Sequence, residues 1–265
     1  SSRGGARTEV PDTLDAQMVV DARLALENGS KMQLSYNVEN TQRAIGTRLS
    51  SHIVRRFGMT GLREGHILVR LRGSAGQSLG AFTTQGLRLD VIGDANDYVG
   101  KGLSGGMIVV RPSAAIGFVA SANTIIGNTV LYGATSGKLF AAGQAGERLC
   151  VRNSGATAVV EGSGSNACEY MTGGNVVILG EVGDNFGAGM TGGMAFIYDE
   201  AGNFESRVNR ESLQLFRIAH PHWENKLRDL VAEHARETES AFAARILNHW
   251  GKALQNFWQV VPTEI

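Results

Sequence analysis

The chain has 265 residues, near the upper limit for a domain with one hydrophobic core, and its 25 acidic residues balance its 25 basic ones. A net charge of zero argues against nucleic-acid and membrane-surface partners, because both require a positive field. The sequence contains no run of about 18 apolar residues, so no membrane-spanning helix is predicted. Two cysteines without a secretory signal predict a reducing compartment, the cytoplasm.

The first 64 residues carry the signals of two helices and one strand. Residues 1–11 lack the apolar core that a secretory signal needs, and we interpret them as a cloning remnant or linker. Apolar residues at helical spacing predict helices over 12–27 and 46–57. Between them, apolar and polar residues alternate over 32–38, which predicts a half-buried strand. We therefore expect residues 12–64 to form an N-terminal cap of helices and one strand.

Glycine is the outlier of the composition, because 26 of the 35 glycines lie between Gly73 and Gly193. This stretch is also rich in Val, Ile and Leu, which distinguishes it from a disordered linker. The pattern G-x-x-G-x-x-x-G is complete at 73–80 and 180–187, and partial copies lie between them. Their central glycines are 17 to 19 residues apart, except for one step of 34 that spans a degenerate copy around Pro112. The stretch is therefore predicted to be a structural repeat.

A second set of glycines keeps nearly the same period, and the third residue after each of them is apolar. A period of about 18–20 residues with glycine corners is typical of a parallel β-solenoid, because glycine tolerates the positive φ of sharp corners. A β-sandwich with glycine-rich turns is the alternative, but it has no reason to keep one period. We predict about seven stacked coils of parallel sheet over residues 65–200. The apolar residues expected to be buried in register are Leu68, Leu89, Val109, Phe140, Ala158, Val177 and Phe196.

Residues 201–265 are predicted to form a helical tail. Trp223, Leu227 and Val231 lie on one amphipathic face, and Ser240 is placed to cap a second helix. Because the end of a solenoid exposes an open edge and an apolar core, we expect terminal helices to cover it.

The sequence from Gly100 to Gly105 fits G-x-G-x-x-G, the dinucleotide fingerprint. That fingerprint requires a following helix whose N-terminus holds the pyrophosphate, whereas residues 107–110 predict a strand. The same pattern recurs at 187–192, inside another copy of the repeat. We therefore interpret it as a feature of the repeat and not as a cofactor site.

Two groups of polar residues resemble parts of metal sites. Asp94, Asn96 and Asp97 suggest a calcium loop, but no bidentate Glu or helix pair accompanies them, so we expect a hydrogen-bonded corner. His220 and His222 have no Cys or carboxylate at ligand spacing, which favours a role in packing the tail.

Cys150 and Cys168 each follow a glycine of the repeat by four residues, as Leu131 does. This shared spacing predicts an apolar ladder, with the two cysteines in contact on adjacent coils about 4.8 Å apart. We expect both thiols to be free, buried and unreactive. No residue of the chain is therefore assigned as catalytic, cofactor-binding or metal-binding.

Several stretches resemble the C-terminal glycine-repeat (GXGXG) domain of the glutamate synthase large subunit. They are GSAGQSLGAF (73–82), GDANDYVGKGLSGGMIVVRP (93–112) and SNACEYMTGGNVVILG (165–180). In addition, NTQRAIGTRLS (40–50) is similar to the entry segment of that domain, and NFWQVVP (256–262) to the end of the same polypeptide. The resemblance covers residues 12–262.

The resemblance implies a right-handed parallel β-helix inside an enzyme that hydrolyses glutamine, passes the ammonia to 2-oxoglutarate and reduces the imine to glutamate. It implies FMN and a 3Fe–4S cluster in that enzyme, both held outside this domain, as is the nucleophilic cysteine. The implied partners are the amidotransferase and FMN-binding domains of the same large subunit, and a reductase small subunit. The implied role is structural: to pack against those domains and keep their spacing. The sequence does not indicate whether NADPH, NADH or ferredoxin supplies the electrons.

Two other classes of function stay open. One is a free-standing glycine-repeat subunit of another redox complex, because similar domains resemble a subunit of formylmethanofuran dehydrogenase. The other is a β-helix enzyme, either a hexapeptide acyltransferase or a polysaccharide lyase. Apolar residues cluster at 176–179 instead of recurring every six positions, which weighs against the transferase. A lyase would need a carboxylate cluster and an aromatic groove, and the repeat shows neither clearly.

Overall fold

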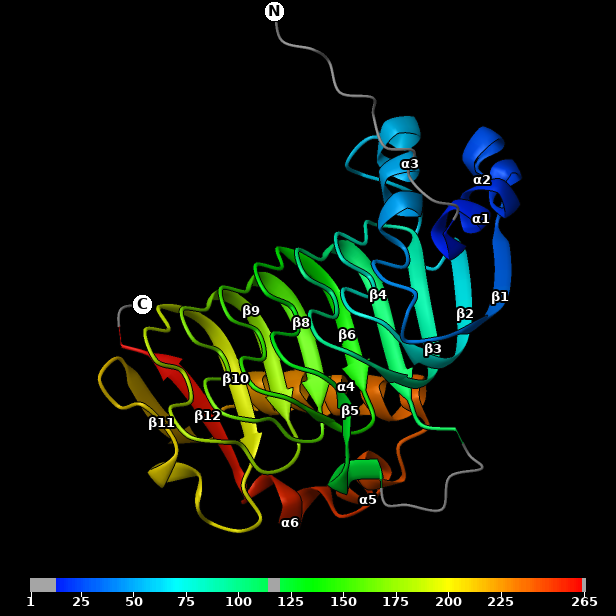
Figure 1. Cartoon of the computed structure of the whole chain (residues 1–265). Coiled ribbons are helices and arrows are strands. Elements are labelled where there is room, and N and C mark those ends of the chain that lie inside the picture. The colour runs from blue at the N-terminus through cyan, green and yellow to red at the C-terminus, as the bar shows by residue number, and fades with distance from the viewer. Residues whose placement is uncertain (1–12, 114–119, 264–265) are drawn as a thin grey trace, which may run out of the picture.

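The computed structural model describes residues 13–113 and 120–263, and its strands form one long sheet (Figure 1). The order in the sheet is β1-β2-β3-β4-β6-β8-β9-β10-β12-β11, with the short strands β5 and β7 attached to β3 as a branch. The strands are β1 (Met32–Val38), β2 (Ile67–Ala75), β3 (Leu87–Ala95), β4 (Ser104–Arg111), β5 (Thr124–Ile126), β6 (Ser136–Ala141), β7 (Gln144–Ala145), β8 (Ser154–Val160), β9 (Thr172–Ile178), β10 (Gly192–Tyr198), β11 (Leu213–Arg217) and β12 (Phe257–Pro262).

Helices flank the sheet at its N-terminal end and along one face. They are α1 (Leu14–Asp21), α2 (Arg23–Asn28), α3 (Thr47–Phe57), α4 (Pro221–Thr238), α5 (Ala241–Asn248) and α6 (Trp250–Leu254), with short 3-10 turns η1 (Ala120–Ala122) and η2 (Phe204–Ser206). Residues 1–11, interpreted as a cloning remnant or linker, lie outside the described residues, and so does part of the degenerate repeat after Pro112. Within 13–113 and 120–263, every helix is too short or too polar to cross a bilayer.

The N-terminal helices are fixed to each other by one buried carboxylate. Thr13 caps α1 by accepting a hydrogen bond from the amide of Ala16. Asp15 then accepts from the amides of Gly46 (3.0 Å) and Arg48 (2.6 Å), which are free donors at the start of α3. Burial raises the pKa of Asp15, and these backbone donors oppose that rise. The predicted strand at 32–38 and the helix at 46–57 are thus confirmed, while the helix at 12–27 is divided into α1 and α2 at Ala22.

Each repeat contributes one strand to the sheet, and the strands from β1 to β10 along the order are parallel. The chain returns between strands through segments in which alternate residues have left-handed backbone. These residues are Ser78, Gly80 and Phe82; Tyr98, Gly100 and Gly102; Thr129, Leu131 and Gly133; Arg148, Cys150 and Arg152; Asn166, Cys168 and Tyr170; and Asn185, Gly187 and Gly189.

The return segments bond to both of their neighbours. The amide of Cys150 donates to Val130 of the preceding repeat at 2.8 Å. The amides of Arg148 and Arg152 donate in the other direction, to Ser165 and Glu169 of the following repeat. Alternating handedness points successive left-handed residues to opposite sides, so the repeats are held together here without β-strands.

The predicted right-handed parallel β-helix with about seven coils is therefore wrong. A β-helix stacks several parallel sheets around each coil, whereas this chain has a single mixed, mostly parallel sheet of twelve strands with flanking helices. The physical reason lies in the return segments, whose left-handed residues cannot join a β-ladder. The last strand pairs, β10 with β12 and β12 with β11, are antiparallel.

The seven residues predicted to be buried in register divide between two cores. Leu89 and Ala158 lie in the core between the sheet and the return segments, and Leu68 is only half-buried. The other four, Val109, Phe140, Val177 and Phe196, are buried on the opposite face of the sheet. A single ladder is therefore wrong, although six of the seven side chains are buried.

The second core is covered by the C-terminal helices. Helix α4 runs along the sheet in Figure 1 and contacts β4, β6, β8 and β9. Leu227 and Val231 are its fully buried apolar residues. The tail helices thus cover a face of the sheet, and the end beside β10 is closed by β12 instead.

Candidate functional site

A buried polar cluster lies where α4 and α5 meet the end of β8. Glu161 directly follows β8, His234 belongs to α4, and Ser240 caps α5. The imidazole Nε2 of His234 donates to Oε1 of Glu161 at 3.0 Å, and the Ser240 hydroxyl donates to the same oxygen. His234 is 0% exposed and Glu161 2%.

This cluster contains a hydroxyl, an imidazole and a carboxylate, but their order differs from that of a hydrolytic triad. In a triad the imidazole lies between the hydroxyl and the carboxylate, so that it can take the hydroxyl proton. Here both groups donate to one carboxylate oxygen, and the Ser240 oxygen also accepts from the amide of Ala243. The arrangement can join α4, α5 and β8, and it cannot activate the hydroxyl.

Charged pairs continue along α4 on both sides of this cluster. Glu237 accepts from Arg88 of β3 at 2.6 Å, and Glu233 accepts from Lys138 of β6 at 2.6 Å. Glu239, just after the helix, pairs with Arg111 of β4. Helix α4 and the residue after it are thus tied to β3, β4, β6 and the residue that follows β8, which are far apart in the sequence.

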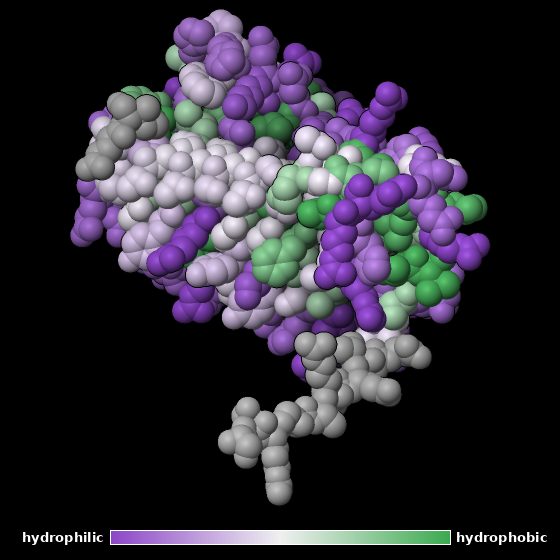
Figure 2. Space-filling model, turned by 90° about the horizontal axis from the view of Figure 1, so that it is seen from above, coloured by the Kyte–Doolittle hydropathy of each residue, from purple (hydrophilic) through white to green (hydrophobic). Residues whose placement is uncertain are grey.

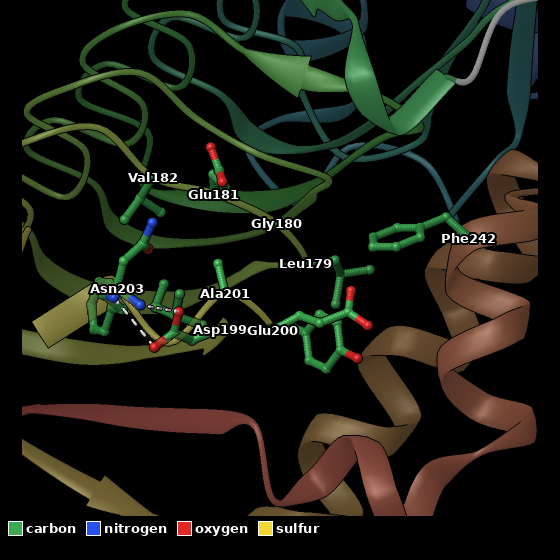
Figure 3. A pocket seen from close by; sticks show the side chains of 12 residues that line it. Leu179, Gly180, Glu181, Val182, Asp199, Glu200, Ala201, Asn203 and Phe242 are labelled. Atoms are coloured by element: carbon green, nitrogen blue, oxygen red, sulfur yellow. Dashed lines mark hydrogen bonds between the residues drawn. The ribbon is translucent and has the colours of Figure 1, made fainter.

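A cavity of about 250 Å³ lies at the ends of β9 and β10, beside Phe242 of α5 (Figure 3). Its carboxylates are Glu181, Asp199 and Glu200, which do not converge on one point in the figure. Asp199 already accepts from the amides of Asn203 and Phe204 and from the indole of Trp258. Within 13–113 and 120–263, no group of three or more His, Cys, Asp or Glu side chains is placed to hold a metal ion.

The polar residues singled out from the sequence have structural roles. Gly100 and Gly102 have positive φ in a return segment that leads into β4 and not into a helix. Asn96 accepts from the amide of Asp97, and Asp97 accepts from the amide of Asn128, which confirms a hydrogen-bonded corner. The ring of His220 accepts from the amide of His222 and so caps α4.

The two cysteines are free and fully buried, as predicted. Burial raises the pKa of both thiols, and the proximity of Cys168 raises the pKa of Cys150 further. Both residues have left-handed backbone at equivalent places in adjacent return segments, together with Leu131. The shared spacing after the repeat glycine therefore did identify equivalent positions.

Comparison with known proteins gives the family. The GXGXG motif family matches residues 15–263, nearly the whole chain. The chain belongs to the GXGXG motif family. This confirms the resemblance to the glutamate synthase large subunit, because relatives of this GXGXG chain carry that name.

Three relatives are informative. The NADPH glutamate synthase large chain of Azospirillum brasilense is 66% identical over 259 residues, covering 98% of this chain and 17% of that protein. The ferredoxin-dependent glutamate synthase of Pyropia yezoensis is 48% identical over 94% of this chain and 16% of its own. The NADH glutamate synthase of Schizosaccharomyces pombe is 46% identical over 95% of this chain and 12% of its own. The GXGXG chain thus spans less than a fifth of each relative.

The cofactors implied by the resemblance do not fit the residues of this GXGXG chain. A 3Fe–4S cluster held by three cysteines needs one cysteine more than the two that the chain has. Both of these are buried, and burial raises the pKa of their thiols. The glycine loop at 100–105 leads into a strand, so no helix N-terminus follows it to hold a flavin phosphate.

Sequence reasoning missed the junction of Glu161, His234 and Ser240. The sequence predicts Ser240 only as a helix cap. The hydrogen bond from His234 to Glu161 joins residues 73 positions apart, and no local pattern signals such a contact.

Proposed function

We propose that this GXGXG chain is a non-catalytic structural domain of a glutamate synthase, the enzyme that converts glutamine and 2-oxoglutarate into two glutamates. The observation that carries the proposal is 66% identity across 98% of the chain to 17% of a glutamate synthase large chain. The proposed partners are the amidotransferase and FMN-binding domains of the same polypeptide, whose spacing this domain keeps, and a reductase small subunit. FMN and the 3Fe–4S cluster belong to those other parts, and the location is cytoplasmic.

The form of the domain supports a spacing role. Two buried cores lie on opposite faces of one sheet, and inter-repeat hydrogen bonds continue through the return segments. Such a body resists bending, because bending would break bonds in both the sheet and the return segments. We propose residues 65–200 as its central unit, with 12–64 and 201–265 as flanking parts.

The names of the relatives support a separation of this domain from the choice of electron donor. Proteins named for NADPH, ferredoxin and NADH all contain a region similar to this chain. A region shared by enzymes with three donors does not by itself select among them. We therefore assign donor choice to other parts of the enzyme.

The test uses the chain alone and the full polypeptide of its gene. The purified chain should show no flavin absorbance and no glutaminase activity. Full polypeptide lacking this region should hydrolyse glutamine without a matching yield of glutamate, because the two reaction centres lose their fixed spacing. A flavin spectrum or glutamine hydrolysis from the chain alone would overturn the proposal, as would a reading frame without amidotransferase and FMN-binding regions.

A further inference from the structure

A groove of about 590 Å³ separates the helices α1 and α2 from α3 at the N-terminal end of the sheet. Its apolar lining comes from Val19, Val20 and Leu26. Val20 is 65% exposed, so its side chain meets solvent in the chain as it stands. Figure 2 shows apolar surface gathered between hydrophilic side chains at the end of the molecule that carries these helices.

The rim of this N-terminal groove is basic. Arg23, His52, Arg55 and Arg56 line it together with a single acid, Glu27. The carboxylate of Glu27 lies 3.7 Å from Arg23, and that exposed pair is neutral as a unit. Arg56 donates to the backbone oxygen of Glu27 and not to its carboxylate. Over the described ranges 13–113 and 120–263, neither Arg55 nor Arg56 makes an ion pair, so two positive charges stand beside the apolar lining.

The dipole of α3 accounts for the two arginines of the groove but not for its exposed apolar lining. Arg55 and Arg56 lie in the last turn of α3, where cations interact favourably with the helix dipole. That effect gives no reason for exposed valine and leucine to line a groove beside them. An apolar centre with a charged rim is instead the composition of a protein–protein interface.

We propose that the N-terminal groove docks an apolar side chain flanked by carboxylates, presented by another domain of the same large-subunit polypeptide. The inference rests on the proposed function, because it takes the partner from the rest of that polypeptide. Two positive charges select carboxylates, and the apolar lining selects the side chain between them. The matched Azospirillum protein extends far beyond this region, which covers 17% of it, so most of such a polypeptide is available.

Tethering makes a small groove sufficient. A partner domain on the same chain reaches the groove at an effective concentration of about millimolar, so few contacts hold it. A second copy of this chain is a poorer occupant, because a two-fold contact would place the basic rim of one copy against the same rim of the other.

Site-specific cross-linking identifies the occupant. A photoreactive phenylalanine analogue replaces Val20 in the full polypeptide, and a matched control replaces Phe216, which is 46% exposed on β11 at the other end of the sheet. Cross-linking at Val20 should yield a peptide from outside this chain that contains Asp or Glu beside an apolar residue. Cross-links to a second copy or to residues 1–12, or none above the Phe216 control, would overturn the inference.

Charge reversal tests the rim. Arg55→Glu with Arg56→Glu should lower the cross-link yield about tenfold, which corresponds to about 1.4 kcal/mol for the two reversed rim charges together. Arg63→Glu, an exposed charge outside the groove, should leave the yield unchanged. Both variants should stay folded, although Arg55→Glu with Arg56→Glu should unfold slightly more easily because it removes two cations from the last turn of α3. An equal cross-link yield in both variants would contradict the assignment of the rim.

Measurement of glutamate synthase activity distinguishes a failure of the docking site from a failure of the proposed function. Glutamate synthase activity in the unmodified full polypeptide, without cross-links at Val20, would refute the docking site alone. A full polypeptide without that activity would refute the proposed function, whatever the groove binds.

Discussion

Left-handed backbone occurs at alternate residues of every return segment, and glycine holds only some of these positions. Leu131, Cys150 and Cys168 occupy the middle position with φ between 57° and 59°, where Gly80, Gly100 and Gly187 stand in other repeats. An apolar side chain at this position is buried in the first core. Burial thus offsets the cost of the strained backbone at these three residues, about 1–3 kcal/mol each.

Three glycine substitutions separate lack of space from backbone strain. A Cβ on Gly93 would lie 1.9 Å from the carbonyl oxygen of Gly73 in the adjacent strand, so Gly93→Ala should cost about 3 kcal/mol or more. Gly133 has φ +62° and open space, so Gly133→Ala should cost only about 1 kcal/mol. Gly251 has open space around it in α6, so Gly251→Ala should raise the free energy of unfolding by about 0.5–1 kcal/mol. Urea unfolding measures all three, and equal costs for Gly93→Ala and Gly133→Ala would contradict the backbone clash.

The buried thiols give a pH-dependent prediction. Because burial raises the pKa of Cys150 and Cys168 in the folded state, both thiols should resist alkylation at pH 8 until the chain unfolds. In the unfolded chain a thiol ionises at about pH 8.5. Their contribution to stability is therefore complete below that pH and declines as the pH rises above it. A Cys150→Ala, Cys168→Ala double variant should show a shallower alkaline loss, and rapid labelling of either native thiol would show that the buried assignment is wrong.

At the scale of elements, the junction of β8, α4 and α5 depends on a buried hydrogen bond between a histidine and a carboxylate, each of which has one unsatisfied atom. Among the residues that the structure describes, Oε2 of Glu161 and Nδ1 of His234 have no hydrogen-bond partner. Removing one member of such a pair leaves an uncompensated polar group in the core, whereas replacing both with apolar residues restores packing.

A double-mutant cycle tests this junction. His234→Leu alone should destabilise the chain by about 3–5 kcal/mol, and the His234→Leu, Glu161→Leu double variant should recover most of that loss. Ser240→Ala, which removes both the cap of α5 and a buried hydrogen bond to Glu161, should cost about 2 kcal/mol. Denaturant unfolding of the four proteins of the cycle gives the coupling energy. A double variant as unstable as the sum of its single changes would mean that the two side chains act independently.

Local sequence signals predicted the helices and strands well, but they predicted poorly which face of the sheet each side chain occupies. The cap at Ser240 and the alternation over 32–38 depend on neighbouring residues, so the sequence shows them directly. The prediction that the third residue after each repeat glycine shares one register failed because the glycines do not hold equivalent positions. Gly137 lies one residue before Lys138, whereas Gly155 lies two residues before Thr157, the strand partner of Lys138. Since side chains alternate between faces, a slip of one residue moved Ala158 to the opposite core from Phe140.

At the scale of the whole molecule, α4 lies across strands that would otherwise contact only their neighbours. A repeat array without such an element is stabilised mainly between adjacent repeats. Arg88, Lys138 and Glu161 come from three repeats, and all pair with side chains of α4. The sequence could not predict this, because those pairs span 73 to 149 residues and each of them depends on where the helix lies. The helix therefore makes the unfolding of the separate repeats cooperative.

Proline placed at two points of α4 tests that cooperativity. Leu230→Pro removes the hydrogen bond to Lys226 in mid-helix and should cost about 3 kcal/mol or more. His222→Pro adds a proline in the first turn, where amides lack helical partners, and should cost about 1 kcal/mol or less through the lost contact with His220. In Leu230→Pro, hydrogen exchange should rise together in β4, β6, β8 and β9, which share α4 as their cover. Equal exchange in the two variants would show that the sheet is stable without the helix, and that neighbouring repeats alone provide its cooperativity.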